Sequence, residues 1–200
     1  MKIVYIPAKS ENLNIQEKLK KVKIKESFVI VTTIQYLDEV KKLKGYKIAG
    51  QILGCNTEVI NKHKINAYLF IGTGKFHPLI LSFRTKKPVY TFDPHTENFS
   101  QISKEELEIY EKKKMASLLR YYNANKIGIL VSTKPGQNNL KRAISFQNKS
   151  KKQSYIFICN QISNLENFPD IKCWINTACP RIFEDDLGVP IINLEDIEKL

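Results

Sequence analysis

The chain has 200 residues, an apolar fraction of 42% and a formal net charge of +12 at pH 7. This length fits one large domain or two small ones, and ten Phe, nine Tyr and one Trp can fill real cores. No apolar run reaches the length of a membrane-spanning helix and no basic-then-apolar leader opens the chain, which predicts a soluble, cytoplasmic protein without a membrane partner.

The positive charge is weak evidence for a nucleic-acid partner. Only four of the 32 basic residues are Arg, the residue that bidentate phosphate and base recognition favours, and the lysines are spread along the chain. A general bias towards Lys, Ile and Asn explains much of the charge, so a dedicated nucleic-acid surface is not expected. A basic face that attracts an acidic or RNA-bound partner stays open.

The first half of the chain alternates strand-like and helix-like segments. The predicted strands are 2–7, 27–33, 46–53, 66–71 and 88–92, and the predicted helices are 14–22, 36–43, 57–64 and a helix that Pro78 opens and that runs to Phe83.

The second half repeats this rhythm. Ser103 and Glu106 form a capping box, which predicts a long helix that ends near Asn123. Its predicted buried side consists of Leu107, Tyr110, Leu118, Leu119 and Tyr122. The strands that follow are 126–131, 154–159, 171–176 and 189–192, with a helix over 138–148 and a last one at the C-terminus.

This alternation predicts an α/β fold of two small, doubly wound, parallel-sheet (Rossmann-like) units. The first unit is expected over 1–102 and contains Cys55; the second is expected over 103–200 and contains Cys179. In such folds ligands collect beyond the carboxyl ends of the strands. Cys55, the loop at Gly72, the loop at Ser132 and Cys179 are all predicted there.

Cys55 and Cys179 each follow an apolar run and precede residues that start helices, Asn56 or Thr57 in one case and Pro180 in the other. A thiol at a helix N-terminus favours the thiolate form, which binds metals. The alternative is a pair of small buried apolar residues. No close-set cysteine pair of the zinc-finger kind is present, so a metal site would be assembled from residues distant in sequence, and a disulfide framework is not expected.

The loop that contains Gly72, Thr73, Gly74 and Lys75 lies between a predicted strand and a predicted helix. Its glycines allow backbone amides to approach a ligand closely, and a helix start favours an anionic group. The loop lacks the third glycine of a dinucleotide fingerprint and the spacing of a P-loop. His77, which follows, is a candidate base or ligand, or a helix cap.

The matching turn of the second unit runs from Ser132 to Gln137 and includes Gly136. Lys134 can contact a carboxylate and Gln137 can hydrogen-bond a polar ligand group; the alternative is a Pro-Gly turn with a solvated lysine. The segment Asp93–His95 is equally ambiguous, since its carboxylate can simply cap a turn.

Five collinear segments resemble archaeal diphthamide synthase: GQILGC at 50–55, FIGTGKFHP at 70–78, DPHT at 93–96, STKPGQ at 132–137 and TACPRI at 177–182. The resemblance covers nearly all of the chain. That family uses S-adenosylmethionine and a 4Fe–4S cluster that three cysteines from three α/β domains hold. It moves a 3-amino-3-carboxypropyl radical to a histidine of elongation factor 2.

By this resemblance the two units correspond to the second and third domains of the family, and Cys55 and Cys179 match the second and third cluster ligands. Cys159 and Cys173 match none and are expected to be buried core thiols. The family chain begins with a further α/β domain that carries the first ligand, and this chain has no segment that resembles it. The resemblance therefore implies a split enzyme whose remaining cysteine ligand comes from a complementary first-domain polypeptide, as part of a homo- or hetero-oligomer.

The placement of the loops suggests which groups would fix the charged parts of S-adenosylmethionine: the amides from Gly72 to Lys75 and the side chains of Lys134, Gln137 and Arg181. Two other functions stay open. One is a non-catalytic partner that positions elongation factor 2 or stabilises an active subunit, and the other is a metal-free nucleotide- or RNA-binding module.

Overall fold

A computed structural model describes residues 4, 6–53, 65–185 and 187–198 of the chain. They form two compact units, Met1–Leu107 and Glu108–Leu200, and each contains its own mainly parallel sheet. This is the mixed α/β, Rossmann-like architecture that the sequence predicts. Within the described part of the chain, no helix has both the length and the apolar character that crossing a bilayer requires.

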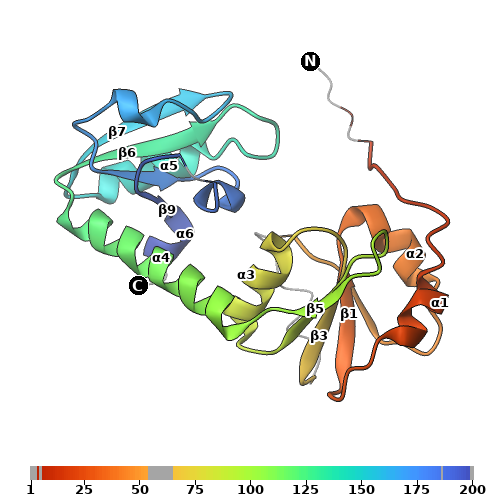
Figure 1. The fold of residues 1–200 in the computed structure, drawn as a ribbon. Coiled ribbons are helices and arrows are strands. Elements are labelled where there is room, and N and C mark those ends of the chain that lie inside the picture. The colour runs from red at the N-terminus through yellow and green to blue at the C-terminus, as the bar shows by residue number, and fades with distance from the viewer. Residues whose placement is uncertain (1–3, 5, 54–64, 186, 199–200) are drawn as a thin grey trace. The chain divides into compact units, whose positions relative to one another are not determined.

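The sheet of the first unit has five strands in the order β2-β1-β3-β4-β5 (Figure 1). Their bounds are Phe28–Thr32 for β1, Ile48–Gln51 for β2, Ala67–Ile71 for β3, Val89–Phe92 for β4 and Phe99–Gln101 for β5. The first four run parallel, whereas β5 pairs antiparallel with β4. The sequence analysis did not predict β5, because a three-residue strand carries almost no hydrophobic periodicity.

Helical segments cover both faces of this sheet. They are α1 at Ile15–Lys18, η1 at Leu19–Lys21, η2 at Ile34–Tyr36, α2 at Leu37–Lys41 and α3 at Phe76–Thr85. Successive residues of β1 point to opposite faces: Val29 and Val31 pack with Leu81 of α3, while Ile30 packs with Ile15 and Val40 on the other side. Burial on both faces explains the continuous apolar runs of these strands.

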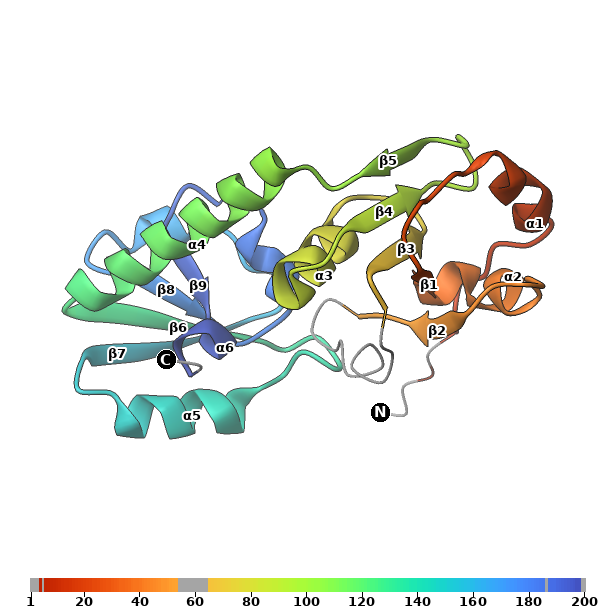
Figure 2. The ribbon, with the colours of Figure 1, turned by 90° about the horizontal axis from the view of Figure 1, so that it is seen from below.

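The second unit has a four-stranded parallel sheet in the order β7-β6-β8-β9 (Figure 2). Its elements are α4 at Lys104–Asn123, which crosses the boundary between the units, β6 at Lys126–Ser132, α5 at Leu140–Lys149, β7 at Gln153–Cys159, η4 at Leu165–Asn167, β8 at Cys173–Asn176, η5 at Pro180–Phe183, β9 at Ile191–Asn193 and α6 at Leu194–Ile197.

The two faces of this second sheet are covered differently. Ile129 and Ile175 pack against residues of α4, α5 and α6 on one face. On the other face Trp174 and Leu130 pack against irregular segments that follow β7 and β8. The core on that face therefore adjoins loops, which also carry the polar residues described below.

The predicted strand at 2–7 is wrong at the positions that the structure describes. Val4 and Ile6 are 73% and 87% exposed, and neither belongs to a strand. A short apolar run becomes a strand only where a neighbour offers free hydrogen-bonding groups, and Pro7 has no N–H to contribute. The predicted helix at 57–64 lies outside the described residues.

The predicted buried side of α4 is partly wrong. Tyr110 is buried and Leu107 and Leu118 are half-buried, as predicted, but Leu119 and Tyr122 are 56% and 55% exposed. Ser117 and Tyr121 pack inward instead. The sequence has apolar residues at adjacent positions 118–119 and 121–122, so periodicity alone does not decide which of each pair faces the sheet.

The capping box at the start of α4 is confirmed. The Glu106 N–H donates to Ser103 Oγ at 3.1 Å, and the Ser103 N–H donates to Glu106 Oε2 at 2.9 Å. We expect Ser103→Ala to lower the free energy of unfolding by about 1 kcal/mol, because it removes the acceptor of an otherwise unpaired helix N–H. Urea denaturation followed by circular dichroism measures the change. Ser163→Ala, at an exposed loop serine, serves as the matched control, and equal losses for both variants would contradict the capping role.

Several lysines act as donors to backbone carbonyls rather than as free surface charges. Lys152 Nζ donates to the carbonyls of Tyr122 and Ala124, each at 2.8 Å, where α4 ends. Lys87 Nζ donates to the Ile65 carbonyl at 2.7 Å. These carbonyls lie at the ends of elements, where the regular hydrogen-bonding pattern leaves acceptors unpaired.

Candidate functional site

The second unit contains a polar cleft at the carboxyl ends of its parallel strands. The cleft has a volume of about 450 Å³. Its walls come from the segments after β6, β7 and β8, which is where a parallel α/β sheet binds its ligands. The lining residues are Ser132, Lys134, Gln137, Asn160, Gln161, Ile162, Cys179, Arg181, Ile182, Asp185 and Leu187.

Four predicted site residues meet in this cleft: Lys134, Gln137, Cys179 and Arg181. They come from two loops that lie more than forty positions apart in the sequence. Parallel pairing of β6 with β8 brings the two loops to one edge, since Leu130, near the end of β6, pairs with Asn176, the last residue of β8.

The turn after β6 is built by its own polar groups. The Lys134 N–H donates to Ser132 Oγ at 3.1 Å, and the Gln137 N–H donates to the Lys134 carbonyl at 3.0 Å. Gly136 has a φ of 76°, in the left-handed region that favours glycine. Gly136 therefore shapes the turn, and among the described residues it is not part of the cleft lining.

Cys179 stands where β8 gives way to a short helix. It is the N-cap residue of η5, and Pro180 takes one of the first helical positions, as predicted. The residue is half-buried and belongs to the lining of the cleft.

Charges of both signs line the cleft. Lys134 and Arg181 are exposed cations, and Asp185 is an exposed anion. Asp185 and the amides of Asn160 and Gln161 were not predicted as site residues. For the two amides a signal existed, because they directly follow β7 in the way that Thr133 and Lys134 follow β6; Asp185 lies in an irregular segment without such a signal.

The other two described cysteines lie in different surroundings. Cys173 is fully buried, and this burial raises the pKa of its thiol to about 12, so the thiol stays protonated at neutral pH. The prediction that Cys159 is a buried core thiol is wrong, because it is half-buried. It ends β7, an edge strand whose residues Tyr155 and Ile158 are 43% and 54% exposed.

In the first unit the loop from Gly72 to Lys75 connects β3 to α3. A Cβ atom at Gly72 would lie 2.9 Å from Cζ of Phe70, so a side chain there would clash with the core. Thr73, Gly74 and Lys75 are exposed. The loop therefore presents backbone to solvent directly above a packed aromatic ring.

Lys75 is fixed by a partner within the same unit. Its ammonium forms an ion pair with the Glu106 carboxylate, the acidic member of the capping box. The Lys75 ammonium, together with the Ser103 N–H, holds the pKa of the Glu106 carboxyl below its usual range. Lys75 thus connects the glycine loop to the start of α4, and its charge is already partly compensated.

His77 lies in the first turn of α3 and packs between aromatic rings. Its ring stacks on Phe70 with centroids 6.1 Å apart, and it meets Phe76 edge-on at 5.2 Å. These contacts describe a histidine that completes the packing beneath the glycine loop. Its predicted role as a base or ligand stays a prediction.

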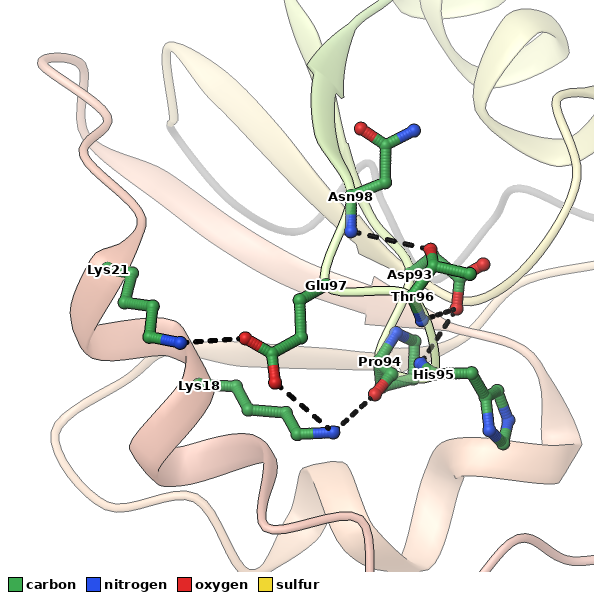
Figure 3. A network of polar contacts seen from close by, with 8 residues as sticks. All are labelled: Lys18, Lys21, Asp93, Pro94, His95, Thr96, Glu97 and Asn98. Carbon is green, nitrogen blue, oxygen red and sulfur yellow. Dashed lines mark hydrogen bonds and ion pairs between the residues drawn. The ribbon is translucent and has the colours of Figure 1, made fainter.

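Asp93 closes a turn, as expected if its carboxylate only caps the segment Asp93–His95. Its Oδ1 accepts the His95 N–H at 2.8 Å and the Thr96 N–H at 3.4 Å. Lys18 Nζ donates to the Pro94 carbonyl at 2.7 Å and so ties this turn to α1 (Figure 3). The carboxylate thus has two backbone partners within its own turn.

Cys55 lies outside the described residues. In the part of the chain that the structure describes, no three His, Cys, Asp or Glu side chains form a metal-binding group. The prediction that Cys55 and Cys179 face a common cleft therefore stays a prediction. Of the predicted metal ligands, the structure places Cys179.

A family model described as "Putative diphthamide synthesis protein" matches residues 1–198 of this chain. A relative from Pyrococcus horikoshii is named 2-(3-amino-3-carboxypropyl)histidine synthase. It is 32% identical over an alignment of 203 positions, gaps included, that covers 89% of this chain and 58% of the relative. The protein of that name from Methanocaldococcus jannaschii is 35% identical over an alignment of 162 positions that covers 78% of this chain and 46% of the relative. The chain thus spans about half the length of these relatives.

A solved structure described as Dph2 from Pyrococcus horikoshii with a 4Fe–4S cluster has a similar fold. It superposes with a TM-score of 0.72 at 30% sequence identity and covers 93% of this chain and 60% of that one. The similarity therefore extends over both units, and about two fifths of the solved chain has no counterpart in the match.

Proposed function

Because this chain belongs to the family of diphthamide synthesis proteins, we propose that it is a subunit or C-terminal half of 2-(3-amino-3-carboxypropyl)histidine synthase. In this role it takes part in the first step of diphthamide biosynthesis, the modification of a histidine of elongation factor 2. The observation that carries the proposal is the cleft of the second unit, which combines the Cys179 thiol with Lys134, Arg181 and Asp185 at the carboxyl edge of a parallel sheet.

The chemistry of Cys179 fits a ligand of an iron–sulfur cluster. A cluster of this kind takes soft thiolate ligands, and Cys179 lines a cleft large enough to admit a ligand. In this proposal Cys55 would supply a second thiolate and a complementary chain a third. A cluster held in this way would supply the reducing electron for cleavage of the sulfur–carbon bond of S-adenosylmethionine.

The charges of the cleft suit the amino-acid end of S-adenosylmethionine, which carries a carboxylate and an ammonium. Lys134 and Arg181 would bind the carboxylate, and Asp185 would bind the ammonium. Gln137 and Asn160 offer amides to the remaining polar groups. The proposal keeps the loop from Gly72 to Lys75 of the first unit as a source of backbone amides for the ligand; Thr73, Gly74 and Lys75 are exposed in it, and His77 stacks on Phe70 nearby.

The proposal includes a complementary first-domain polypeptide. The match covers 58% of the Pyrococcus horikoshii synthase, so the whole enzyme contains a large segment beyond the matched part. Two thiolates would hold a 4Fe–4S cluster poorly, since two irons would lack protein ligands. The chain alone is therefore expected to be an incomplete catalyst.

Arg181→Ala is expected to weaken the binding of S-adenosylmethionine to the assembled synthase by roughly 10- to 100-fold, the value of one charge-assisted hydrogen bond. Equilibrium dialysis with labelled S-adenosylmethionine measures the affinity. Lys151→Ala, which removes an exposed cation that does not line the cleft, is the matched control. Unchanged affinity in the Arg181 variant would remove this residue from the proposed site.

The proposed function is tested by anaerobic co-expression with a candidate first-domain protein, followed by iron analysis, visible spectroscopy and an assay of transfer to elongation factor 2. We expect low iron content and no transfer for the chain alone, and both cluster and transfer for the complex. Full activity of the chain alone would refute the split enzyme. Protein that stays colourless in both preparations but binds RNA with a strong salt dependence would replace the proposal with a nucleic-acid-binding module.

A further inference from the structure

The loop that carries Cys179 is bracketed by a buried amide at the end of β8. Asn176 is 3% exposed. Its Oδ1 accepts the Ala178 N–H at 2.9 Å, and its Nδ2 donates to the Cys179 carbonyl at 2.8 Å. One side chain therefore holds the peptide between Thr177 and Ala178 and the peptide between Cys179 and Pro180, and these two bonds fix the path of the backbone through Cys179.

A second buried amide, from the end of β9, holds the first. Asn193 is 8% exposed, and its Oδ1 accepts the remaining N–H of Asn176 Nδ2 at 2.7 Å. Its own Nδ2 donates to the Pro180 carbonyl at 3.3 Å. Since β8 and β9 are neighbouring parallel strands, with Asn176 paired to Asn193, the sheet register sets this contact.

A third amide reaches the same loop from the start of α5. Asn139 is the N-cap residue of that helix, but its side chain makes no capping hydrogen bond. Its Nδ2 donates instead to the Thr177 carbonyl at 2.6 Å, while the neighbouring Asn138 accepts the Leu140 N–H at 3.2 Å. The Asn139 side chain therefore hydrogen-bonds the Cys179 loop instead of capping α5, the usual role of an N-cap asparagine.

These amides are costly to bury unless they make all their hydrogen bonds. Asn176 and Asn193 end the central strand β8 and the edge strand β9, and each bonds both the loop 178–180 and the other amide. An apolar residue at either position would lose these bonds. What the amides add is a single fixed path for the backbone around Cys179.

We propose that Asn176, Asn193 and Asn139 are positioning residues that fix the Cys179 thiol at the cleft wall in the geometry that a cluster ligand needs. The inference rests on the proposed function for its purpose. We call Asn139, Asn176 and Asn193, which hydrogen-bond the loop 177–180, the asparagine clamp. Its effect on Cys179 can be tested on the thiol itself, without any cluster.

The test measures the alkylation rate of Cys179 in the native chain by iodoacetamide and peptide mass spectrometry. All variants carry Cys173→Ala, because trypsin cleaves after Lys172 and Arg181 and the resulting peptide then contains a single cysteine. Asn176→Leu removes both bonds to the loop, and we expect the rate to change by about tenfold or more, the effect of losing at least one buried hydrogen bond. Asn176→Asp keeps the acceptor for the Ala178 N–H and should restore part of the native rate.

Two further variants separate positioning from stability. Asn139→Asp suits a helix N-cap and so preserves the fold, but it loses the donor to Thr177; we expect a smaller change of the same direction as in Asn176→Leu. Ile129→Val removes a buried methylene from β6 without touching the loop, and it should lower stability and leave the Cys179 rate unchanged. Cys159, alkylated in the same samples, serves as the internal reference.

Native Cys179 rates in both the Asn176→Leu and Asn139→Asp variants would overturn the clamp. In the co-expressed synthase, we expect Asn139→Asp to alter the electron paramagnetic resonance spectrum of the reduced cluster, and a native spectrum would overturn its role toward the cluster. A cluster that survives Cys179→Ala would instead refute the proposal that Cys179 is a cluster ligand. The alkylation result for the asparagines would not be affected.

Discussion

If the chain has the proposed function, replacing Cys179 with Ala is expected to abolish the iron–sulfur cluster of the assembled synthase and, with it, the transfer reaction. Cys179 is a half-buried residue of the cleft lining, and in the proposed site its removal would leave one iron without a protein ligand. A half-buried Cys→Ala change removes little volume, so the fold should remain, with a loss of about 1 kcal/mol or less. Iron content and visible absorbance after anaerobic purification measure the result.

The remaining cysteines act as controls for this prediction. Cys173→Ala should keep the cluster, because the thiol is fully buried in β8 and its pKa of about 12 keeps it protonated. Cys159→Ala should keep it as well, at the end of the edge strand β7. We expect Cys55→Ala to lose it, on the family resemblance. Loss of the cluster in a folded Cys173 or Cys159 variant would show that the ligands are wrongly assigned.

Gly128→Ala is expected to destabilise the second unit by about 3 kcal/mol or more, enough to unfold it at moderate temperature. A Cβ atom at Gly128 would lie 2.3 Å from Cε3 of Trp174 and 2.4 Å from its Cζ3. Neither the backbone at Gly128 nor the Trp174 indole can move aside. Gly128 lies in β6, which pairs with a strand on each side. The indole is fully buried, and its ring centroid lies 4.7 Å from that of Phe157.

Thermal denaturation of the chain followed by near-ultraviolet circular dichroism measures this effect through the Trp174 signal. Gly188→Ala is the matched control: Gly188 has a φ of 67° but open space where a Cβ would lie, so backbone strain alone should cost about 1–2 kcal/mol. Trp174→Leu in the Gly128→Ala background should recover part of the loss, since it removes the ring that the new methyl group meets. A Gly128→Ala variant as stable as the native chain would refute this packing argument.

The fold could be predicted because its strands are buried on both faces. The residues of β3, Ala67–Ile71, are all buried, and such an uninterrupted apolar run between helical segments indicates a parallel strand without knowledge of its neighbours. The position of the cleft could also be predicted from the parallel arrangement. Since parallel strands end at one edge, the loops that carry Lys134 and Cys179 had to approach each other once both strands joined one sheet.

The wrong predictions concern residues whose burial or strand conformation depends on which segments pair in space, and local sequence does not determine that pairing. Val4 and Ile6 are as apolar as a buried strand, yet they are exposed. Cys159 ends an apolar run, but the position of β7 at the edge leaves it half-buried. The asparagines around Cys179 were not predicted as site residues either, because the contact between Asn176 and Asn193 depends on the register of β8 with β9.

The lysines that donate to backbone carbonyls determine where this surface can be altered to promote crystal growth. Replacing flexible lysines with alanine helps crystals form, because ordering a long side chain at a lattice contact costs entropy. Lys23 and Lys25 are exposed in the extended segment before β1 and suit such replacement. Lys152 does not, since Lys152→Ala would deprive the Tyr122 and Ala124 carbonyls of the ammonium that closes the end of α4. Reagents that acylate lysine would disturb the same position, so a chemically modified sample should be checked for the integrity of that helix.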